Sequence, residues 1–438
     1  MVGKEDQSRA LRSAKSSWKS LSVPRQQQYF IDRIVLHVLI QRSLRIPLAV
    51  LESQSGSDES AEPWQGPVAS LLRLLRRLCH GLRWQQTVGE QYVTLHPGVY
   101  VGCVPEEHTA ETLSLVEHRC NDLGSYSVTI LLAPLLILAP FGKHMTRVRF
   151  RRVVTESSVP ETIDAFLNCT LPLAQACLGN DSWSALTLSR SLQVQLLRRD
   201  VVSSSPARAE GATPRGAVLF ECPVLRNRLD LATLRNALRG GSDFHGRSVI
   251  QKLRGVVSTA GIAPTWGLRL IDLSRSCFQR WLSEVYIHAV RVPKAHTPMC
   301  GITVWAESAD GCIYAASASW AEDLDAFSAE LGNLVGFVRL DALFYSRLVT
   351  RLRRCIRRAG RTDSNHQNLL IWYMALAPST EPLQVCLGTH VAPWSRLLVG
   401  DLERALGARF HLQQDPSTRL WWLRSRGIDY CNWSRARS

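Results

Sequence analysis

The sequence of 438 residues lacks several features that mark common classes of functional site. No C-x-x-C pair occurs among its 12 cysteines, and even the closest two, Cys169 and Cys177, are too far apart for a zinc finger or ribbon. No G-x-x-x-x-G-K-[ST] or G-x-G-x-x-G loop is present, so we expect neither a metal nor a nucleotide cofactor. The longest apolar run, residues 128–141, is short and twice interrupted by proline, so no membrane-spanning segment is expected.

Acidic residues are also scarce relative to basic ones. The 52 Lys and Arg residues against 37 Asp and Glu residues give a formal net charge of +15, which predicts a polyanionic partner. Residues 1–25 are polar and have no apolar core, so no secretory signal is indicated, and free thiols in a reducing compartment are expected. Because Glu5 and Asp6 are acidic, a flexible basic tail is favoured there over a mitochondrial presequence.

The remaining chain divides into three parts by its pattern of apolar residues. A tail over residues 1–26 precedes an alternation of strand-like and helix-like segments over 27–225. Residues 226–318 contain a compact strand, helix and three-strand pattern, and residues 319–438 return to the alternation of helices and strands. Two breaks rich in small and polar residues are expected to be loops: residues 52–66 and 203–216.

Residues 128–155 combine an apolar run with a basic strand. A buried helix is expected to end near Pro140, and the following period-2 pattern indicates a strand with apolar residues on one face and arginines on the other. The arginines of that face are Arg147, Arg149 and Arg151. They are candidate RNA contacts, although exposed strand faces are often basic for solubility alone.

A second basic segment lies at residues 343–359. If these residues form one helix, four arginines at i, i+4, i+7 and i+11 share one stripe, beside an apolar stripe that would pack on a sheet. The stripe consists of Arg347, Arg351, Arg354 and Arg358, and Arg353 and Arg357 widen it. The alternative is a solvated face whose arginines cover apolar neighbours. We favour RNA contact, because Asp341 is the only acid between Arg339 and Arg361.

Eight segments of the chain resemble one known family. Residues 128–155 are similar to the "LEPLLxLAPF-K…LRGVT" signature of the RNA 3'-terminal phosphate cyclase superfamily, specifically its cyclase-like, ribosome-assembly branch. Seven further segments match family segments in the same order: residues 29–36, 94–102, 216–224, 253–256, 286–288, 301–308 and 368–376. Each match is degraded, so the chain is identified as a divergent member.

The resemblance implies a fold and a place for chemistry. The fold would be α/β (α+β): a cyclase-type large domain of repeated two-helix, four-strand units, with a smaller α/β domain inserted at 226–318. Active cyclases use a histidine near the start of a late helix as the nucleophile that takes up AMP. The matching position here is Arg396, whose guanidinium keeps its proton and cannot attack phosphorus. His390 lies six residues earlier, and by its spacing it is expected to face elsewhere.

A nuclease site has been suggested for the cyclase-like branch, at a short Arg-Asp-x-Lys group in the same helix. The matching residues here, 400–403, read Gly-Asp-Leu-Glu, so the arginine is lost and the lysine position is acidic. Asp401 and Glu403 would point about 200° apart on a helix and could not chelate one metal ion. A solvated helix face is expected there.

The resemblance therefore implies a pseudoenzyme that acts as a non-catalytic ribosome-biogenesis factor. It would serve in small-subunit (18S-type) pre-rRNA processing and assembly, within the small-subunit processome in the nucleolus of the nucleus. Its partners would be the nucleolar GTPase of that particle, pre-rRNA and other processome proteins, and it would be a monomer within this large ribonucleoprotein. Two alternatives stay open: a pre-rRNA endonuclease at Asp401, and a residual cyclase that uses an unrecognised histidine.

Overall fold

The computed structural model describes most of the chain, with twelve described ranges. They are residues 18–53, 64–86, 91–104, 115–120, 123–179, 191–200, 215–225, 228–239, 249–292, 298–320, 340–358 and 360–432. Most of the tail expected at 1–26, and most of both expected loops, lie outside these ranges. The predicted tail includes the start of a helix, because α2 (Val23–Ile40) begins at Val23. A proline lies in the first turn of this helix, where its missing N–H costs no hydrogen bond.

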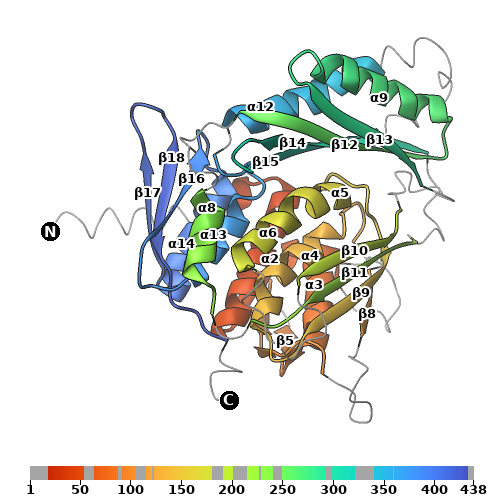
Figure 1. Ribbon diagram of the computed structural model, residues 1–438. Coiled ribbons are helices and arrows are strands. Elements are labelled where there is room, and N and C mark those ends of the chain that lie inside the picture. Colours follow the sequence, from red (N-terminus) through yellow and green to blue (C-terminus); the bar gives the residue numbers. More distant parts are fainter. Residues whose placement is uncertain are drawn as a thin grey trace.

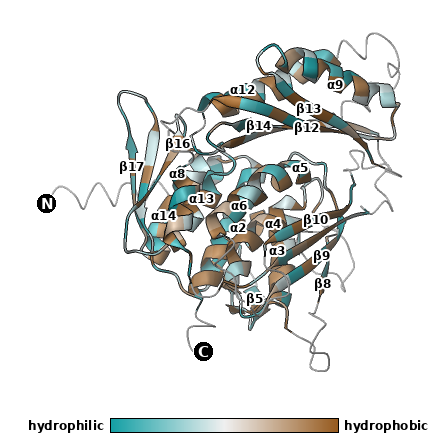
Figure 2. Ribbon diagram, viewed as in Figure 1, coloured by the Kyte–Doolittle hydropathy of each residue, from teal (hydrophilic) through white to brown (hydrophobic). Residues whose placement is uncertain are grey.

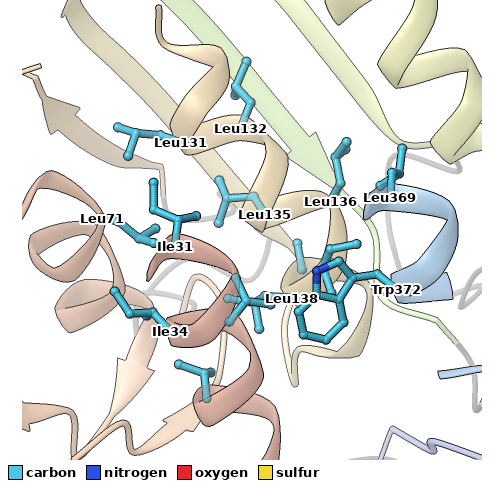
Figure 3. Packing of buried hydrophobic residues seen from close by; sticks show 14 of the residues in the cluster. Ile31, Ile34, Leu71, Leu131, Leu132, Leu135, Leu136, Leu138, Leu369 and Trp372 are labelled. Atoms are coloured by element: carbon cyan, nitrogen blue, oxygen red, sulfur yellow. The ribbon is translucent and has the colours of Figure 1, made fainter. Parts of the chain in front are cut away.

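A group of helices forms the centre of the larger of two units (Figure 1). Helix α4 (Thr129–Leu138) is apolar on nearly all sides and α13 (Gln367–Leu376) is buried along its whole length, as expected for helices inside a core. Figure 3 shows Ile31 and Ile34 of α2 facing Leu135 and Leu138 of α4. The prediction of a buried helix ending near Pro140 is confirmed, because α4 runs into the short turn η3 (Ala139–Phe141). The other helices of this unit are η1 (Trp18–Ser20), η2 (Leu48–Val50), α3 (Gly66–Leu78), α5 (Ile163–Ala165), η4 (Phe166–Thr170), α6 (Leu171–Leu178), α8 (Leu231–Arg239) and α14 (Pro393–Leu406).

Three main sheets surround these helices. The largest has the strand order β10-β11-β9-β8, with β9 (Thr146–Val153) antiparallel to β11 and parallel to β8. Val148 and Phe150 of β9 are fully buried, so the predicted basic strand with one apolar face is confirmed. The remaining strands of that sheet are β8 (Val116–Arg119), β10 (Gln193–Arg198) and β11 (Gly216–Cys222). The second sheet has the order β1 (Leu44–Pro47), β6 (Tyr92–His96), β5 (Arg83–Gln86). The third has the order β16 (Leu383–Gly388), β18 (Trp421–Arg426), β17 (Arg409–Gln414). Short pairs complete the unit: β2 (Glu52–Ser53) with β3 (Trp64–Gln65), and β4 (Cys79–His80) with β7 (Val99–Tyr100).

The smaller unit is one four-stranded sheet covered by helices on its outer face (Figure 1). Its strand order is β13-β12-β14-β15, with β12 parallel to β13 and antiparallel to β14. The strands are β12 (Ile250–Ala260), β13 (Glu284–Arg291), β14 (Met299–Ser308) and β15 (Ile313–Ser319). Figure 2 shows hydrophilic and hydrophobic residues around α9 (Pro264–Phe278), as expected for a helix with one buried face.

The basic segment is helical over its described residues 343–358, as predicted, and continues the cover of this sheet. The π-helical turn η5 (Phe344–Val349) leads directly into α12 (Thr350–Arg358). Its apolar side chains Phe344, Leu348 and Leu352 are buried in the core of the smaller unit together with α9.

Packing places the limits of the smaller unit differently from the predicted range of 226–318. Helix α8, expected inside the inserted domain, contributes Leu234 and Leu238 to the large core and packs against α6 and β16. The η5–α12 segment, expected in the last part of the large domain, belongs to the small core. Apolar periodicity identifies a buried face but does not tell which core buries it.

Candidate nucleic-acid interface

A cleft of about 370 Å³ lies at the seam between the two units. It opens between α12 and β15 on one side and the starts of α2, α13 and α14 on the other. We call it the interdomain cleft; it is lined by Arg25, Ser158, Pro160, Glu161, Ala165, Ala315, Ala316, Ser317, Arg351, Arg354, Cys355, Arg358, Ser364, Asn365, His366, His390 and Trp394. The seam is closed beside it by hydrogen bonds, one between Thr162 Oγ1 and Thr303 Oγ1 (2.8 Å) and one from the Tyr314 hydroxyl to the Gly360 carbonyl (2.8 Å).

Three exposed arginines of α12 form one side of the cleft, which we call the cleft wall: Arg351, Arg354 and Arg358. Arg351 Nη1 donates to the Ser317 carbonyl at 3.2 Å. Within the described ranges, Arg354 and Arg358 make no ion pair. Like charges one and two turns apart on a helix repel each other, so a ligand that supplies negative charge would stabilise this wall.

The other arginines predicted for the same stripe point elsewhere. Arg353 lies over the indole of Trp281, with 4.1 Å from its guanidinium carbon to the ring centroid, on the α9 side of the helix. Arg357 is exposed and does not line the cleft. Arg347 is half-buried and also outside the cleft lining, because the π-helical turn closes i→i+5 hydrogen bonds and so rotates it out of step with α12. The six predicted arginines are therefore split over at least two faces.

The opposite side of the cleft rests on a largely buried ionic cluster, which we call the cleft floor: Glu161, Asp363 and His366. His366 Nδ1 lies 2.8 Å from Asp363 Oδ1, and His366 Nε2 lies 3.3 Å from Glu161 Oε2. Both carboxylates accept further bonds: Asp363 from the N–H groups of Ala315 (3.2 Å) and Asn365 (2.9 Å), and Glu161 from Thr170 (2.8 Å).

The protonation of the cleft floor follows from these contacts. Burial disfavours the charged imidazole, but the charge and hydrogen bond of Asp363 outweigh it, with help from Glu161, and raise the pKa of His366 well above its usual value. Burial likewise opposes the charge of Asp363, whose pKa is nevertheless lowered by His366 and by backbone N–H donors. His366 is therefore an imidazolium with both nitrogens donating, and it has no lone pair for nucleophilic attack.

Arg25 adds a fourth guanidinium to the cleft. It was not among the site residues predicted from the sequence. It stacks on Trp394, 3.8 Å from the ring centroid, and donates to Asn365 Oδ1 and Gln28 Oε1 at 2.6 Å. Burial lowers the pKa of Arg25 to about 10, against the opposing charges of Asp363 and Glu161, so it stays charged at neutral pH. No local motif reveals its place in the cleft, because Asn365 and Trp394, which hold it there, come from the other end of the chain.

The start of α14 presents different residues to the cleft than the sequence suggested. Trp394 lines the cleft, whereas Arg396 is exposed and lies over Trp421, 5.1 Å from the ring centroid, away from the lining. The expectation that His390 faces elsewhere is wrong, because it does line the cleft. Residue 390 precedes the helix, so helical spacing does not govern its direction. Burial lowers the pKa of His390, and the nearby positive charges of Arg358 and Arg396 lower it further, so its imidazole is neutral at pH 7.

Asp401 is buried instead of solvated, which corrects the expectation for that helix face. It is 8% exposed, faces α2 and lies 3.9 Å from Arg33 Nε, with a further ion pair to Arg404. Glu403 points away and accepts from the Phe410 N–H at 3.2 Å, consistent with the predicted divergence of the two carboxylates. Among the described residues, no cluster of three His, Cys, Asp or Glu side chains could hold a metal ion.

The predicted strand arginines lie on the outer face of β9, outside the interdomain cleft. Arg147 pairs with Glu221 at 2.5 Å. Arg149 and Arg151 share Glu117, at 3.6 and 2.7 Å. None of the three lines the interdomain cleft.

Comparison with known proteins connects both units to one family. The family model described as "RNA 3'-terminal phosphate cyclase (RTC), insert domain" matches residues 246–329, which include the whole β12–β15 sheet. An RNA 3'-terminal phosphate cyclase-like protein of Mus musculus is 25% identical over 358 residues, 80% of each chain. A probable one of Drosophila melanogaster is 23% identical over 363 residues, 80% of this chain and 78% of the other. The rRNA processing protein rcl1 of Schizosaccharomyces pombe is 25% identical over 311 residues, 69% and 73% of the two chains.

Proposed function

Because the chain belongs to the RNA 3'-terminal phosphate cyclase-like family, as a divergent member of cyclase-type fold with an inserted domain, we propose that it acts in rRNA processing by binding RNA, without cyclase activity. The name of the fission-yeast relative, an rRNA processing protein, supports the process. The names of the other relatives, cyclase-like, support a role apart from that of the cyclases themselves.

The observation that carries the proposal is the charge of the interdomain cleft. Arg25, Arg351, Arg354 and Arg358 surround a cleft of about 370 Å³, and four guanidinium groups exceed the single net negative charge that Glu161, Asp363 and His366 leave in its floor. Guanidinium groups bind phosphate oxygens in bidentate fashion and do not lose their proton. Trp394 beside them offers an indole already stacked by Arg25, an arrangement suited to a nucleotide at the end or bend of a single strand.

We base the proposed lack of cyclase activity on His366, Trp394 and Arg396. His366 is held as an imidazolium by two carboxylates, and Trp394 stands on the first turn of α14, where an indole offers no nucleophile. Arg396 is outside the cleft and could not take part in any case. An endonuclease at Asp401 is disfavoured, because that carboxylate is buried and paired with arginines of α2 and α14.

In its finer form, the proposal places the protein in the small-subunit processome of the nucleolus. There it would act as a non-catalytic factor in the processing and assembly of 18S-type pre-rRNA, within a ribonucleoprotein and bound to a nucleolar GTPase and other processome proteins. The family resemblance supports this assignment, and the net charge of +15 is compatible with residence on rRNA.

The test is affinity purification of the tagged full-length protein, with sequencing of bound RNA and identification of bound proteins. We expect precursor rRNA from the 18S region, small-subunit assembly proteins and one GTPase. Recovery of mature or unrelated RNAs, with no assembly proteins, would contradict the proposal.

One observation favours a residual cyclase as the second candidate. His390 is a neutral imidazole in the same cleft as the arginine wall. In such an enzyme its nitrogen would attack the α-phosphorus of ATP, forming a phosphoramidate to AMP and releasing pyrophosphate. Incubation with ATP labelled at the α-phosphate decides between the two. Label that stays on the wild-type protein and is lost in His390→Ala would establish the cyclase, and no label in either is expected.

A further inference from the structure

The outer face of the four-stranded β10-β11-β9-β8 sheet carries a second concentration of arginines, separate from the interdomain cleft. An open hollow of about 440 Å³ lies there, at the ends of β8, β9 and β10 and the start of β11. Its lining shares no residue with that of the cleft. We call it the arginine hollow, after the six arginines that line it: Arg119, Arg149, Arg151, Arg152, Arg198 and Arg215.

Strand register explains why these side chains gather. Arg119 of β8 is the register partner of Arg151 of β9, Arg151 is the partner of Ala217 of β11, and Ala217 is the partner of Arg198 of β10. Register partners in neighbouring strands point to the same face, so three arginines and one alanine form a row across all four strands. The small side chain of Ala217 leaves the depression in the middle of this row.

A β-bulge adds another guanidinium to the hollow. The pairing of β9 with β11 passes from Arg151↔Ala217 directly to Val153↔Gly216, so Arg152 is the extra residue. Its φ of 58° is left-handed, a conformation that an arginine rarely adopts, and it breaks the alternation that would otherwise send its side chain to the buried face. Bulges commonly re-aim a side chain in this way next to functional surfaces.

The hollow keeps a large positive charge after its internal pairs are counted. Glu117 pairs with Arg149 and Arg151, and Asp200 lies beside the backbone N–H of Arg215. Among the described residues, the lining therefore holds six guanidinium groups against these two carboxylates, an excess of four. Arg119, Arg151, Arg198 and Arg215 are all exposed.

From this geometry we infer that the arginine hollow is a second RNA site, which takes the sugar–phosphate backbone of an RNA double helix. The row of arginines crosses four strands spaced about 4.8 Å apart, so it extends over about 14 Å and can contact several phosphates. Apart from the arginines, the described lining consists of Leu197, Gly216 and Ala217, and none of these residues offers an aromatic ring for stacking on an unpaired base. Double-helical RNA is bound mostly through shape and backbone, which suits such a surface.

The lining also favours RNA over an acidic protein segment. Protein interfaces draw their affinity from buried aromatic or large apolar anchors, and among the residues that the structure describes in this lining only the half-exposed Leu197 has a large apolar side chain. The inference rests on the proposed RNA binding and extends it: with two separate surfaces, one molecule could hold a single-stranded segment in the cleft and a helical segment on the sheet.

The test compares three double variants of the full-length protein, each removing two positive charges. Arg119→Gln with Arg198→Gln changes the hollow, and Arg354→Gln with Arg358→Gln changes the cleft wall. Arg409→Gln with Arg426→Gln is the control, because these exposed arginines are register partners on a remote sheet. Binding of a blunt 20-base-pair RNA duplex, an unstructured 20-nucleotide RNA and a poly-glutamate peptide is measured by fluorescence anisotropy at several salt concentrations, after urea unfolding has established that each variant is folded.

We expect the hollow variant to bind the duplex about tenfold more weakly, with a salt slope lower by about 1 to 2, while the control stays within about twofold of the wild type. Unchanged duplex binding by the hollow variant, with single-strand binding lost in the cleft variant, would overturn this inference and leave the proposed function standing. Failure of the wild type to bind either RNA would overturn both. Tighter binding of poly-glutamate than of duplex, lost in the hollow variant, would assign the hollow to a protein and equally overturn the inference.

Discussion

The floor and the wall of the interdomain cleft carry similar numbers of charged groups but use them in opposite ways. In the floor, Asp363 and His366 are buried and Glu161 is partly buried, and the imidazolium pairs with both carboxylates at 2.8 and 3.3 Å. In the wall, Arg351, Arg354 and Arg358 are exposed and share no carboxylate among the described residues. Charges that are satisfied internally hold the two units together, whereas charges that are left unsatisfied are available to a ligand.

The floor also explains how the small unit is fixed to the large one. Asp363 accepts the backbone N–H of Ala315 in β15, a strand of the smaller sheet, while it holds His366 beside the first turn of α13. A single carboxylate thus couples the position of the arginine wall to the large core.

The largest effect is expected from breaking the floor. Asp363→Asn removes the negative charge that keeps His366 protonated, and it leaves a buried imidazolium with one carboxylate. Removing one partner of a buried ion pair costs about 3 to 5 kcal/mol, so we expect the free energy of unfolding in urea to fall by about that amount.

The control for this change is Asp272→Asn, which removes the same charge from the exposed face of α9. That substitution should change the free energy of unfolding by less than about 0.5 kcal/mol. Equal losses in the two variants would show that the ionic cluster does not hold the seam.

The pH dependence of stability should reveal the same cluster. The pKa of His366 is raised in the folded state, so the folded protein holds this proton more tightly than the unfolded chain. Its contribution is therefore complete below pH 6.5 and is lost as the pH rises through the folded pKa. We expect His366→Gln to lower the free energy of unfolding by more at pH 6 than at pH 9.5, when both proteins are unfolded in urea.

For the wall, the comparison is between two faces of the same helix. Arg354→Gln with Arg358→Gln removes two charges from the cleft, and Arg353→Gln with Arg357→Gln removes two from outside it. We expect the first pair to weaken binding of single-stranded RNA about tenfold and the second by less than about threefold, with little change in stability for either. Anisotropy titrations against salt provide the measurement.

Equal losses of affinity in these two variants would show that the helix attracts RNA through its total charge alone. The cleft would then have no special part in binding. Both double variants remove two positive charges from the same helix, so they differ only in the positions of the arginines that are replaced.

The arginines of the cleft wall could be predicted from the sequence, whereas the ionic cluster of the cleft floor could not, and the difference has a physical reason. The spacing of Arg351, Arg354 and Arg358 is a local periodicity, visible without any fold, and the structure places all three in one cleft. The floor joins Glu161 to His366 across 205 residues, and no local pattern announces such a contact. A π-helical turn likewise leaves no clear mark in the sequence, so the displacement of Arg347 could not be foreseen.

The overall architecture was accessible because it depends on apolar patterns of whole segments. The buried helix before Pro140, the basic strand β9 and the strand–helix–strand arrangement of the smaller unit were all expected, and the α/β class is confirmed. The direction of His390 could not be predicted in this way. His390 lies in a connection whose path is set by hydrogen bonds, such as that from Gln367 Nε2 to the His390 carbonyl.

The smallest effect is expected at Arg396, the position that sequence matching had assigned to a lost nucleophile. Its guanidinium lies over Trp421 on the surface, a contact worth about 0.5 to 1 kcal/mol at an exposed site. Arg396→Gln should therefore lower the free energy of unfolding by at most about that amount and leave RNA affinity unchanged. Trp394→Ala, two residues away, should weaken RNA binding several-fold, because it removes the ring on which Arg25 is stacked inside the cleft. If Arg396→Gln reduced RNA affinity as strongly as the loss of Arg354 and Arg358, the functional surface would have to extend around α14 to the C-terminal sheet. The interdomain cleft could then no longer be regarded as the principal site.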